Sequence, residues 1–473
     1  MKTILFLAYY YPPINNAGTQ RIEKFVKYLP DFGIRPIVLT TSYFSRYFDQ
    51  VKSFTLTKRL DREKRREEKK IGIYRAGELR NLVVRKGKKR QQNIGGYSEI
   101  RNNSWLAKIK QFIKTWLLFP DSKVTWLPFA FFYSLWLIKK YRVEYIVSSF
   151  PPATSPLLSW FLKKCTYVKW IADFRDGWCL DPLEPTFSQS PLRLFLEKRL
   201  ETAVVKNCDQ ILVTSPDIGD YFKKYQNKVS FLPNGYDEQD FVLAKRGLEK
   251  FQDLKKYFII SHTGAFYYSH PGNTPRYFLQ ALKEVFLEHP EMKTKTQVFF
   301  LGNLTFAEKK MAHKMGLGTR VKVLGLRPHQ EAIQYRLISD VLLLVDRPTK
   351  GPIKSEDFMG DPRSKPPEFF QNFGGAPRNK VRSSYIHGKI FEHLRARKPI
   401  LALLPQGACR DFLSELGVGE IVEPQDIAGI KKKLWELFSE WQKGGILRYE
   451  LTDEELAKFE RKNLTKRLVE IMK

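Results

Sequence analysis

TILFLAYYYPPINNAGTQRIEKFVKYLPDFGIRPIVLTT (residues 3–41) decides the fold class, because it reads as one strand–helix–strand unit. The apolar run at 3–11 is typical of a strand buried on both faces of a parallel sheet, and RPIVLTT (35–41) is the next strand. Between them, a helix ending at Gly33 is predicted by four apolar residues at i, i+3, i+4 and i+7 spacing: Ile22, Phe25, Val26 and Leu29. Alternating strand and helix signals predict a parallel sheet with right-handed crossovers.

The same rhythm runs through the rest of the 473 residues and restarts once, after a charged stretch at 238–256. Further strands are predicted at 144–150, 168–174, 210–215 and 228–235, and then at 257–267, 296–303, 320–326 and 340–346. The sequence therefore predicts an α/β, GT-B-like fold of two doubly wound Rossmann-like domains that face a central cleft. We expect domains at 1–240 and 241–440, and a C-terminal helix at 441–473 that could cross back to the first domain.

Two segments interrupt this rhythm and are interpreted as insertions. Residues 51–115 contain 20 Lys and Arg against six Asp and Glu, and residues 349–382 are rich in Pro, Gly, Lys and Arg without periodicity. The helix predicted at 105–119 places Trp105 and Trp116 on an apolar face and Lys108, Lys110 and Lys114 on the other. Such a helix fits an anionic membrane surface, and packing on the protein core is the alternative.

The overall composition favours an anionic partner, because the net charge is +31. Nucleic acid is disfavoured because the excess charge concentrates in one insertion and no recognition motif is present.

The four cysteines form no CxxC pair, which argues against a zinc site or a disulfide framework and for a reducing compartment. The start of the chain reads as a buried strand rather than a signal peptide, and the apolar stretch at 124–138 is shorter than a membrane span.

The stretch SSYIHGKIFEHLRARKPILALLPQG (383–407) gathers the strongest site candidates. Lys389 and Glu392 are three apart, so they share one helix face, where a phosphate and a ribose diol would suit them and a surface ion pair is the alternative. Gly18 and Gly264 follow the first strand of each predicted domain, where a glycine lets an anion approach a helix N-terminus; ordinary turn glycines are the alternative. Neither glycine belongs to a GxGxxG or Walker motif.

Five motifs in order resemble family-4 glycosyltransferases of the bacterial surface-polysaccharide type. KIFEHLRARKPILALLP (389–405) resembles the donor-site helix of that family, and FLAYYYPPINNAGTQR (6–21) its opening glycine loop. WIADFRDGW (170–178) is similar to an acceptor-domain motif, FLPNGYDEQDF (231–241) to the interdomain segment, and VKVLGLRPHQEAIQYRLISDVLLL (321–344) to the strand–helix–strand before the nucleotide site.

The resemblance implies a retaining, metal-independent glycosyltransferase without a cofactor, which uses a nucleotide-sugar donor. It implies catalytic roles for Lys389, Arg327 and Asp173. The implied donor-binding residues are Gly18, Gly264, His270, Arg276, Arg327, Lys389 and Glu392, with Glu392 on the ribose. The implied acceptor-binding residues are Arg21, Asp173, Arg175 and Asp176, although Asp173 and Asp176 could equally cap a strand end beside Arg175.

The chain departs from the family pattern at three positions. Ser384 stands where the family has a glutamate near the transferred sugar, and Ala265 and His270 stand where an Arg and a Lys often hold the diphosphate. A non-catalytic membrane-associated scaffold therefore stays open as an alternative. A sugar-nucleotide epimerase, which shares the fold class, is another, although the matches at 170–178 and 389–400 favour a transferase. The expected acceptor is a glycan or a lipid-linked glycan, and the expected location is cytoplasmic, peripheral on the inner face of a bacterial membrane.

Overall fold

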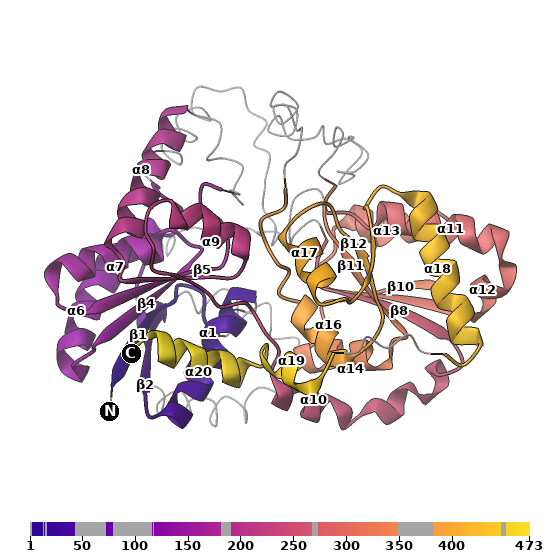
Figure 1. Cartoon of the computed structure of the whole chain (residues 1–473), viewed down its shortest axis with the longest axis horizontal. Helices are drawn as coiled ribbons and strands as arrows, with labels where there is room; N and C mark the ends of the chain where they lie inside the picture. The colour runs from indigo at the N-terminus through magenta and orange to yellow at the C-terminus, as the bar shows by residue number, and fades with distance from the viewer. Residues whose placement is uncertain are drawn as a thin grey trace, which may run out of the picture. The chain divides into compact units, whose positions relative to one another are not determined.

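The computed structural model describes residues 2–12, 14, 17–42, 72–78, 116, 118–180, 191–266, 273–348, 382–445 and 451–473. The chain divides into two compact units (Figure 1). Unit 1 comprises Met1–Pro233 together with Arg461–Lys473, and unit 2 comprises Asn234–Glu460. The division thus falls after Pro233, whereas the boundary predicted from the sequence falls after residue 240.

Unit 1 is built on a seven-stranded sheet in the order β3-β2-β1-β4-β5-β6-β7, and every strand pairs in parallel with its neighbour. The strands are β1 (Thr3–Leu7), β2 (Arg35–Thr41), β3 (Ile73–Ala76), β4 (Tyr145–Phe150), β5 (Lys169–Phe174), β6 (Gln210–Val213) and β7 (Val229–Phe231). The helices are α1 (Ala17–Tyr28), α6 (Leu127–Tyr141), α7 (Thr154–Cys165), α8 (Pro191–Asn207), α9 (Pro216–Lys223) and α20 (Arg461–Ile471), with short 3-10 turns at Leu29–Phe32 and Val124–Trp126.

Unit 2 repeats this design on a six-stranded sheet in the order β10-β9-β8-β11-β12-β13. Its strands are β8 (Phe258–Thr263), β9 (Thr296–Leu301), β10 (Val321–Gly325), β11 (Val341–Val345), β12 (Ile400–Leu403) and β13 (Glu420–Val422). Its helices are α10 (Glu238–Lys245), α11 (Arg276–Glu288), α12 (Pro290–Lys295), α13 (Phe306–Lys314), α14 (His329–Ile338), α16 (Ile390–Ala396), α17 (Ala408–Glu415), α18 (Ile427–Gln442) and α19 (Asp453–Ala457), with a 3-10 segment at Leu248–Leu254.

The order of the strands reverses direction once in each sheet, between β1 and β4 in unit 1 and between β8 and β11 in unit 2. Ligands of doubly wound sheets bind outside the carboxyl ends of the strands at such a switch point. The predicted fold class, two doubly wound Rossmann-like α/β domains, is confirmed. One interpretation was wrong: the basic segment 51–115 is not purely an insertion, because β3 within it pairs with β2 as the edge strand of the sheet.

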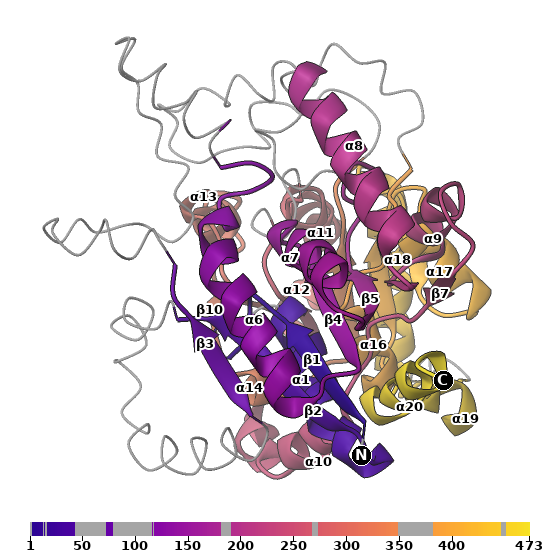
Figure 2. The same ribbon diagram turned by 90° about the vertical axis from the view of Figure 1, so that its left-hand side faces the viewer.

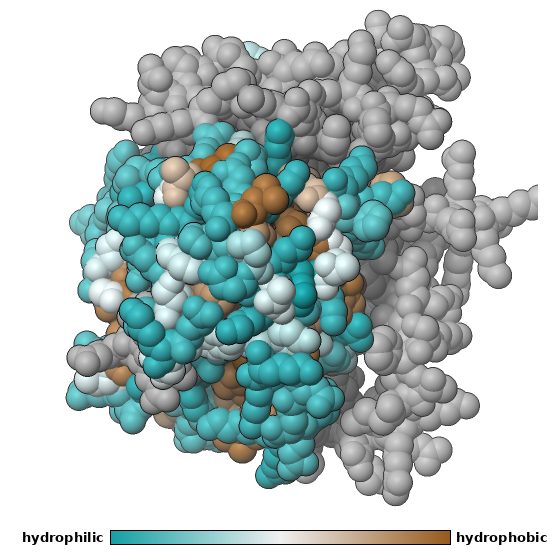
Figure 3. All heavy atoms as spheres, turned by 90° about the vertical axis from the view of Figure 1, so that its right-hand side faces the viewer, coloured by the Kyte–Doolittle hydropathy of each residue, from teal (hydrophilic) through white to brown (hydrophobic). Residues whose placement is uncertain are grey.

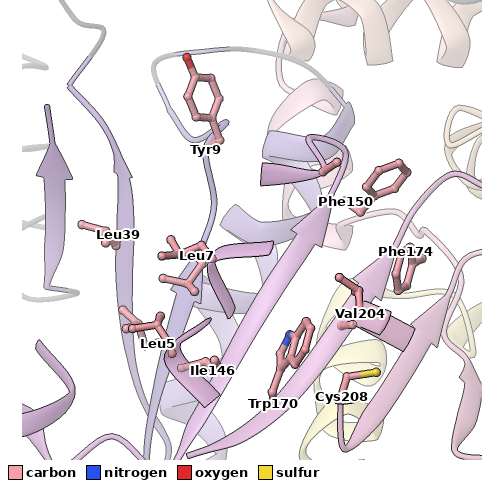
Figure 4. Packing of buried hydrophobic residues seen from close by; sticks show 14 of the residues in the cluster. Leu5, Leu7, Tyr9, Leu39, Ile146, Phe150, Trp170, Phe174, Val204 and Cys208 are labelled. Atoms are coloured by element: carbon pink, nitrogen blue, oxygen red, sulfur yellow. The ribbon is translucent and has the colours of Figure 1, made fainter. Parts of the chain in front are cut away.

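The core of unit 1 covers both faces of its sheet, which explains the near-continuous apolar strands. On one face, Leu5, Ile146 and Trp170 pack with Val204 and Cys208 of the α8 region (Figure 4). On the other face, Ile4 and Phe6 pack with apolar residues of α1 and of the C-terminal helix α20. The hydroxyl of Tyr145 also donates a hydrogen bond to the carbonyl of Met472. The end of the chain is therefore part of unit 1.

Candidate functional site

The switch point of unit 2 begins at the carboxyl end of β8, where the backbone needs glycine. Gly264 has φ +114°, a value that L side chains rarely adopt. A Cβ placed on Gly302, at the end of the neighbouring strand β9, would lie 2.2 Å from the carbonyl oxygen of Gly264. A Cβ on Gly264 itself would lie 3.2 Å from Nζ of Lys389. Gly264 and Lys389, two of the predicted donor-binding residues, are thus brought together, with the lysine head against the bare glycine backbone.

Lys389 immediately precedes α16, and its Nζ is buried without a hydrogen-bond partner among the described residues. Burial, together with the positive charge of Arg336, lowers the pKa of Lys389 to about 8, although Asp346 opposes this shift. A buried ammonium group without a partner is unfavourable, so this position gains from a bound anion. Lys389 does not pair with Glu392, and the surface ion pair considered from the sequence is therefore excluded.

Glu392 lies on the first turn of α16 and is held by two residues of α14. Its Oε1 lies 2.7 Å from Nε2 of His329, and its Oε2 lies 2.7 Å from a guanidinium nitrogen of Arg336. Burial alone would raise the pKa of Glu392, but Arg336 and His329 outweigh it and hold that pKa well below its usual value. Glu392 is therefore an ionised carboxylate, and each of its oxygens keeps a second lone pair for another donor.

Arg336 is the charged residue of this site that the sequence analysis missed. Its side chain is 5% exposed, one nitrogen pairs with Glu392, and Nε and the remaining NH₂ group have no partner among the described residues. Burial lowers its pKa, against the influence of Glu392. In sequence it is one cation in an amphipathic helix, and nothing in its neighbours indicates that it points inward.

Two neutral histidines lie in the same electrostatic environment. His262 of β8 is fully buried, its Nδ1 lies 3.0 Å from the carbonyl oxygen of Leu343, and its ring stacks on Phe266. His393 of α16 is also fully buried, and neither ring nitrogen has a hydrogen-bond partner among the described residues. Burial lowers the pKa of both rings well below the usual value; Lys389 adds to this for both, and Arg336 for His393. These two rings therefore add no positive charge to that of Lys389 and Arg336.

A buried carboxylate ends β11 on the other side of the switch point. Oδ1 of Asp346 accepts a hydrogen bond from the Tyr385 hydroxyl at 2.6 Å, Oδ2 accepts one from the Ser383 hydroxyl at 3.3 Å, and Nε2 of His387 lies 3.5 Å from Oδ2. These bonds hold the segment that leads into Lys389. The sequence signal for this residue is an aspartate directly after an apolar strand, and Asp346 was not among the predicted site residues.

The other donor-site predictions are not gathered around Lys389 by the contacts that the structure gives. Arg327 is exposed, donates from Nε to the carbonyl of Leu324 at 3.1 Å and lies 3.9 Å from Glu331. Arg276 begins α11, where its backbone N–H donates to the Thr274 hydroxyl at 3.3 Å. Ser384 is buried and Ala265 is half-buried. His270 lies outside the described residues.

In unit 1, the glycine loop after β1 meets Arg175 at the end of β5. A Cβ on Gly18 would lie 1.9 Å from a guanidinium nitrogen of Arg175, so the arginine occupies the space beside the glycine. Arg175 also donates to the Ser149 hydroxyl at 2.9 Å and to the Pro151 carbonyl at 2.6 Å, and burial lowers its pKa. Asp176 is half-buried beside it. Gly18, Arg175 and Asp176 therefore share one end of the sheet.

Arg21 and Asp173 form a buried ion pair in the same unit. The distance between the Arg21 guanidinium and Oδ1 of Asp173 is 2.8 Å, and the two side chains are 0% and 1% exposed. Arg21 also donates to the carbonyls of Leu232 and Pro233. The pair therefore links α1 and β5 to the backbone at Leu232 and Pro233. Both side chains were predicted to bind the acceptor, but neither is exposed to solvent.

The predicted membrane helix falls mostly outside the described residues. Trp105, Lys108, Lys110 and Lys114 are not described, whereas Trp116 is helical and half-buried. Within the described ranges, no helix combines the length and the apolar character needed to cross a bilayer. The described part of the chain also holds no cluster of three or more His, Cys, Asp or Glu side chains placed to bind a metal ion.

No protein-family model and no curated protein matches the sequence. Solved structures do match the fold along the whole chain. A glycosyltransferase from Rickettsia africae is 14% identical with a TM-score of 0.56, covering 99% of this chain and 97% of its own. Sucrose-phosphate synthase from Thermosynechococcus elongatus is 12% identical with a TM-score of 0.59, covering 100% and 98%.

A third match is the N-terminal domain of trehalose-6-phosphate phosphatase from Candida albicans, 11% identical with a TM-score of 0.57 and coverage of 100% and 96%. At such low identity, these similarities concern the fold alone. This chain therefore shares a GT-B-like fold of two Rossmann-like domains with these three structures, over nearly the full length of each.

Proposed function

We propose that the protein is a retaining glycosyltransferase that takes a sugar from a nucleotide-sugar donor bound to unit 2. The observation that carries this proposal is the buried ammonium group of Lys389 against Gly264 at the switch point, which has no hydrogen-bond partner in the part of the chain that the structure describes. A diphosphate would supply the charge and the hydrogen-bond acceptors that this group lacks. The glycosyltransferase and the sucrose-phosphate synthase among the structural neighbours support the same class of reaction by analogy of fold.

The donor would lie across the carboxyl ends of β8 and β11. Glu392 would accept hydrogen bonds from the ribose hydroxyls through the lone pairs that His329 and Arg336 leave open. Arg276, Arg327 and His270 are proposed to complete the diphosphate and sugar contacts when the donor is present. Asp346 would act indirectly, because it holds the segment before Lys389.

The chemistry asked of these residues is stabilisation of the leaving group. As the glycosidic bond breaks, the sugar acquires oxocarbenium character and the diphosphate gains negative charge. A fixed cation in a buried site stabilises that charge more than solvent does. We propose that Lys389 has this role and that no metal ion takes part, so added EDTA is expected to leave the rate unchanged.

Unit 1 is proposed to bind the acceptor, a glycan or lipid-linked glycan used in bacterial surface-polysaccharide synthesis. Gly18, Arg175 and Asp176 lie at the switch-point end of its sheet. The Arg21–Asp173 pair would support this end, and a catalytic contact by Asp173 would require the pair to open. With net charge +31, we propose a cytoplasmic enzyme that binds the inner face of the membrane.

The test starts with thermal shifts of the protein against UDP-, GDP- and ADP-sugars, compared with Lys389→Ala. We expect one donor class to stabilise the wild type and not the variant. Mass spectrometry of reactions with that donor, with and without bacterial lipid extract, then identifies products. An isomerised nucleotide sugar formed without acceptor would indicate an epimerase, and no stabilisation by any of the donors would favour the scaffold.

A further inference from the structure

One side of unit 1 exposes aromatic side chains to solvent. Helix α6 carries Phe129, Phe132 and Trp136, which are 38%, 71% and 45% exposed. They recur at i, i+3 and i+7 and so form one stripe, opposite the buried residues Ala130 and Leu137. Aromatic side chains that served only to pack the protein core would be buried. The exposure of this stripe therefore indicates an interaction surface.

The two helices beside α6 repeat the pattern. Helix α7 packs between α6 and α8, and all three lie on the side of unit 1 that faces the viewer in Figure 2. Helix α7 exposes Phe161, and α8 exposes Leu192, Phe195 and Leu196. The α6–α8 surface, meaning the exposed residues of these three helices, is therefore apolar along several turns.

Every exposed charge on the α6–α8 surface is positive. Helices α6 and α7 contain no Asp or Glu, and both glutamates of α8 are buried: Glu197 binds Arg193 and Trp178, and Glu201 binds Cys179 and Tyr221. The exposed or partly exposed cations are Lys139, Lys140, Lys163, Lys164, Lys198, Arg199 and Lys206.

The cations also stand directly on the aromatic rings. Nζ of Lys140 lies 4.3 Å from the ring centre of Trp136, Nζ of Lys164 lies 4.2 Å from that of Trp160, and the guanidinium of Arg199 lies 4.7 Å from that of Phe195. Rings that enter the interfacial layer below lysine and arginine heads are typical of segments that lie on an anionic bilayer. The face of unit 2 that Figure 3 shows is mostly hydrophilic.

We propose that the α6–α8 surface docks on an anionic lipid bilayer, with its aromatic side chains at the level of the head groups. Charge complementarity favours lipid phosphates over a second copy of this chain, because two such surfaces would repel each other. The proposal rests on the proposed function only for its purpose, which is to bring unit 1 to a lipid-linked acceptor. It is distinct from the helix predicted at 105–119.

The test measures co-sedimentation with phosphatidylcholine vesicles, with and without 30% phosphatidylglycerol, in the absence of donor and acceptor. The variant is Phe132→Ser, Lys139→Glu and Lys140→Glu combined. Its control is Phe306→Ser, Lys309→Glu and Lys310→Glu on α13, where an exposed phenylalanine also lies beside two lysines and Lys310 stacks on Phe306. Both change the net charge equally.

We expect the wild type and the α13 variant to bind anionic vesicles, and the α6 variant to bind about tenfold or more weakly. Unaltered binding by the α6 variant, equal loss in both variants, or no binding by the wild type would overturn the proposal.

Sedimentation velocity provides a further check: loss of a wild-type dimer in the α6 variant would instead assign the surface to a second copy. The pair Lys139→Glu and Lys140→Glu replaces the triple variant if that variant fails to fold. Donor binding by Lys389→Ala tests the proposed function, whereas vesicle binding tests the docking surface. Either proposal can therefore fail while the other holds.

Discussion

At the scale of single residues, the state of Lys389 makes a prediction about pH. Its pKa is lowered to about 8, so the ammonium form that would bind a diphosphate dominates below pH 8 and is lost as the pH rises above it. We expect the affinity for a nucleoside diphosphate, measured by calorimetry, to fall between pH 7 and pH 9.5. Lys389→Ala should bind at least about tenfold more weakly at pH 7, with a flatter profile.

The same variant should lower kcat/KM by about 10²-fold or more, because the leaving group would lose its cation. The exposed lysine Lys309, changed to alanine, is the matched control and should leave both quantities unchanged. If Lys389→Ala were fully active, the stabilisation of the leaving group would have to come from Arg276 or Arg327.

Glu392 makes a second prediction at this scale. Glu392→Gln keeps the shape of the side chain but removes the charge that would accept the ribose hydroxyls, so nucleotide affinity should fall at least about tenfold. It also leaves the buried Arg336 uncompensated, so the melting temperature should fall, since breaking a buried pair costs about 3–5 kcal/mol.

Arg336→Met separates these two effects. In the double variant with Glu392→Gln, the loss of stability should be less than the sum of the two single losses, because the pair is broken only once. Calorimetry that gave an unchanged nucleotide affinity for Glu392→Gln would remove Glu392 from the donor site.

At the scale of elements, helix α8 carries a buried carboxyl group that makes stability depend on pH. Burial raises the pKa of Glu201, whose oxygens accept from the Cys179 N–H at 3.0 Å and the Tyr221 hydroxyl at 2.7 Å. A raised folded-state pKa means that stability is fully present below the unfolded pKa and is lost as the pH rises through the folded value.

Glu201→Gln should therefore raise the melting temperature at pH 8, by on the order of 2–4 °C, and have a smaller effect near pH 4. The amide oxygen can still accept from the Cys179 N–H, and the amide nitrogen can donate to the Tyr221 oxygen. Glu415→Gln, at an exposed position of α17, is the control. Destabilisation by Glu201→Gln at pH 8 would mean that the ionised carboxylate is worth more than its burial costs.

At the scale of the whole molecule, the net charge of +31 predicts salt-dependent binding to anionic surfaces. Lys108, Lys110 and Lys114 changed together to glutamate should strongly weaken binding to anionic liposomes, since each cation near such a surface contributes about 1 kcal/mol. Salt should weaken the wild type in the same way, because charges are screened over about 10 Å at 0.1 M.

Donor binding belongs to unit 2 and should survive this triple change, which calorimetry can verify. The charge-matched control is Lys309→Glu, Lys310→Glu and Lys314→Glu on α13. If the triple variant of 108–114 still pelleted with liposomes, the segment would have no part in docking, and the α6–α8 surface would have to account for any binding.

Elements were predictable where their signal was local. The strands β1, β2, β4, β5, β8, β9 and β11 are long apolar runs, and α1, α11 and α18 show apolar residues at helical spacing. Strand β3 was not predicted, because four residues among dense charge give too short a pattern to be recognised and it is stabilised by pairing with β2. Helix α8 was missed because its apolar residues lie on both faces, one buried and one exposed.

The sequence by itself determined the two doubly wound domains, Gly264 after β8, and Lys389 and Glu392 three residues apart at the start of α16, because periodicity, glycine and spacing act over a few residues. Only the tertiary structure decided that Nζ of Lys389 is buried against Gly264 with no partner among the described residues, that Arg336 and His329 hold Glu392, and that Asp173 is covered by Arg21. It likewise decided that the aromatic stripe of α6 faces outward. The physical reason is that ionic pairing and burial depend on distances between segments far apart in the chain, and only packing sets those distances.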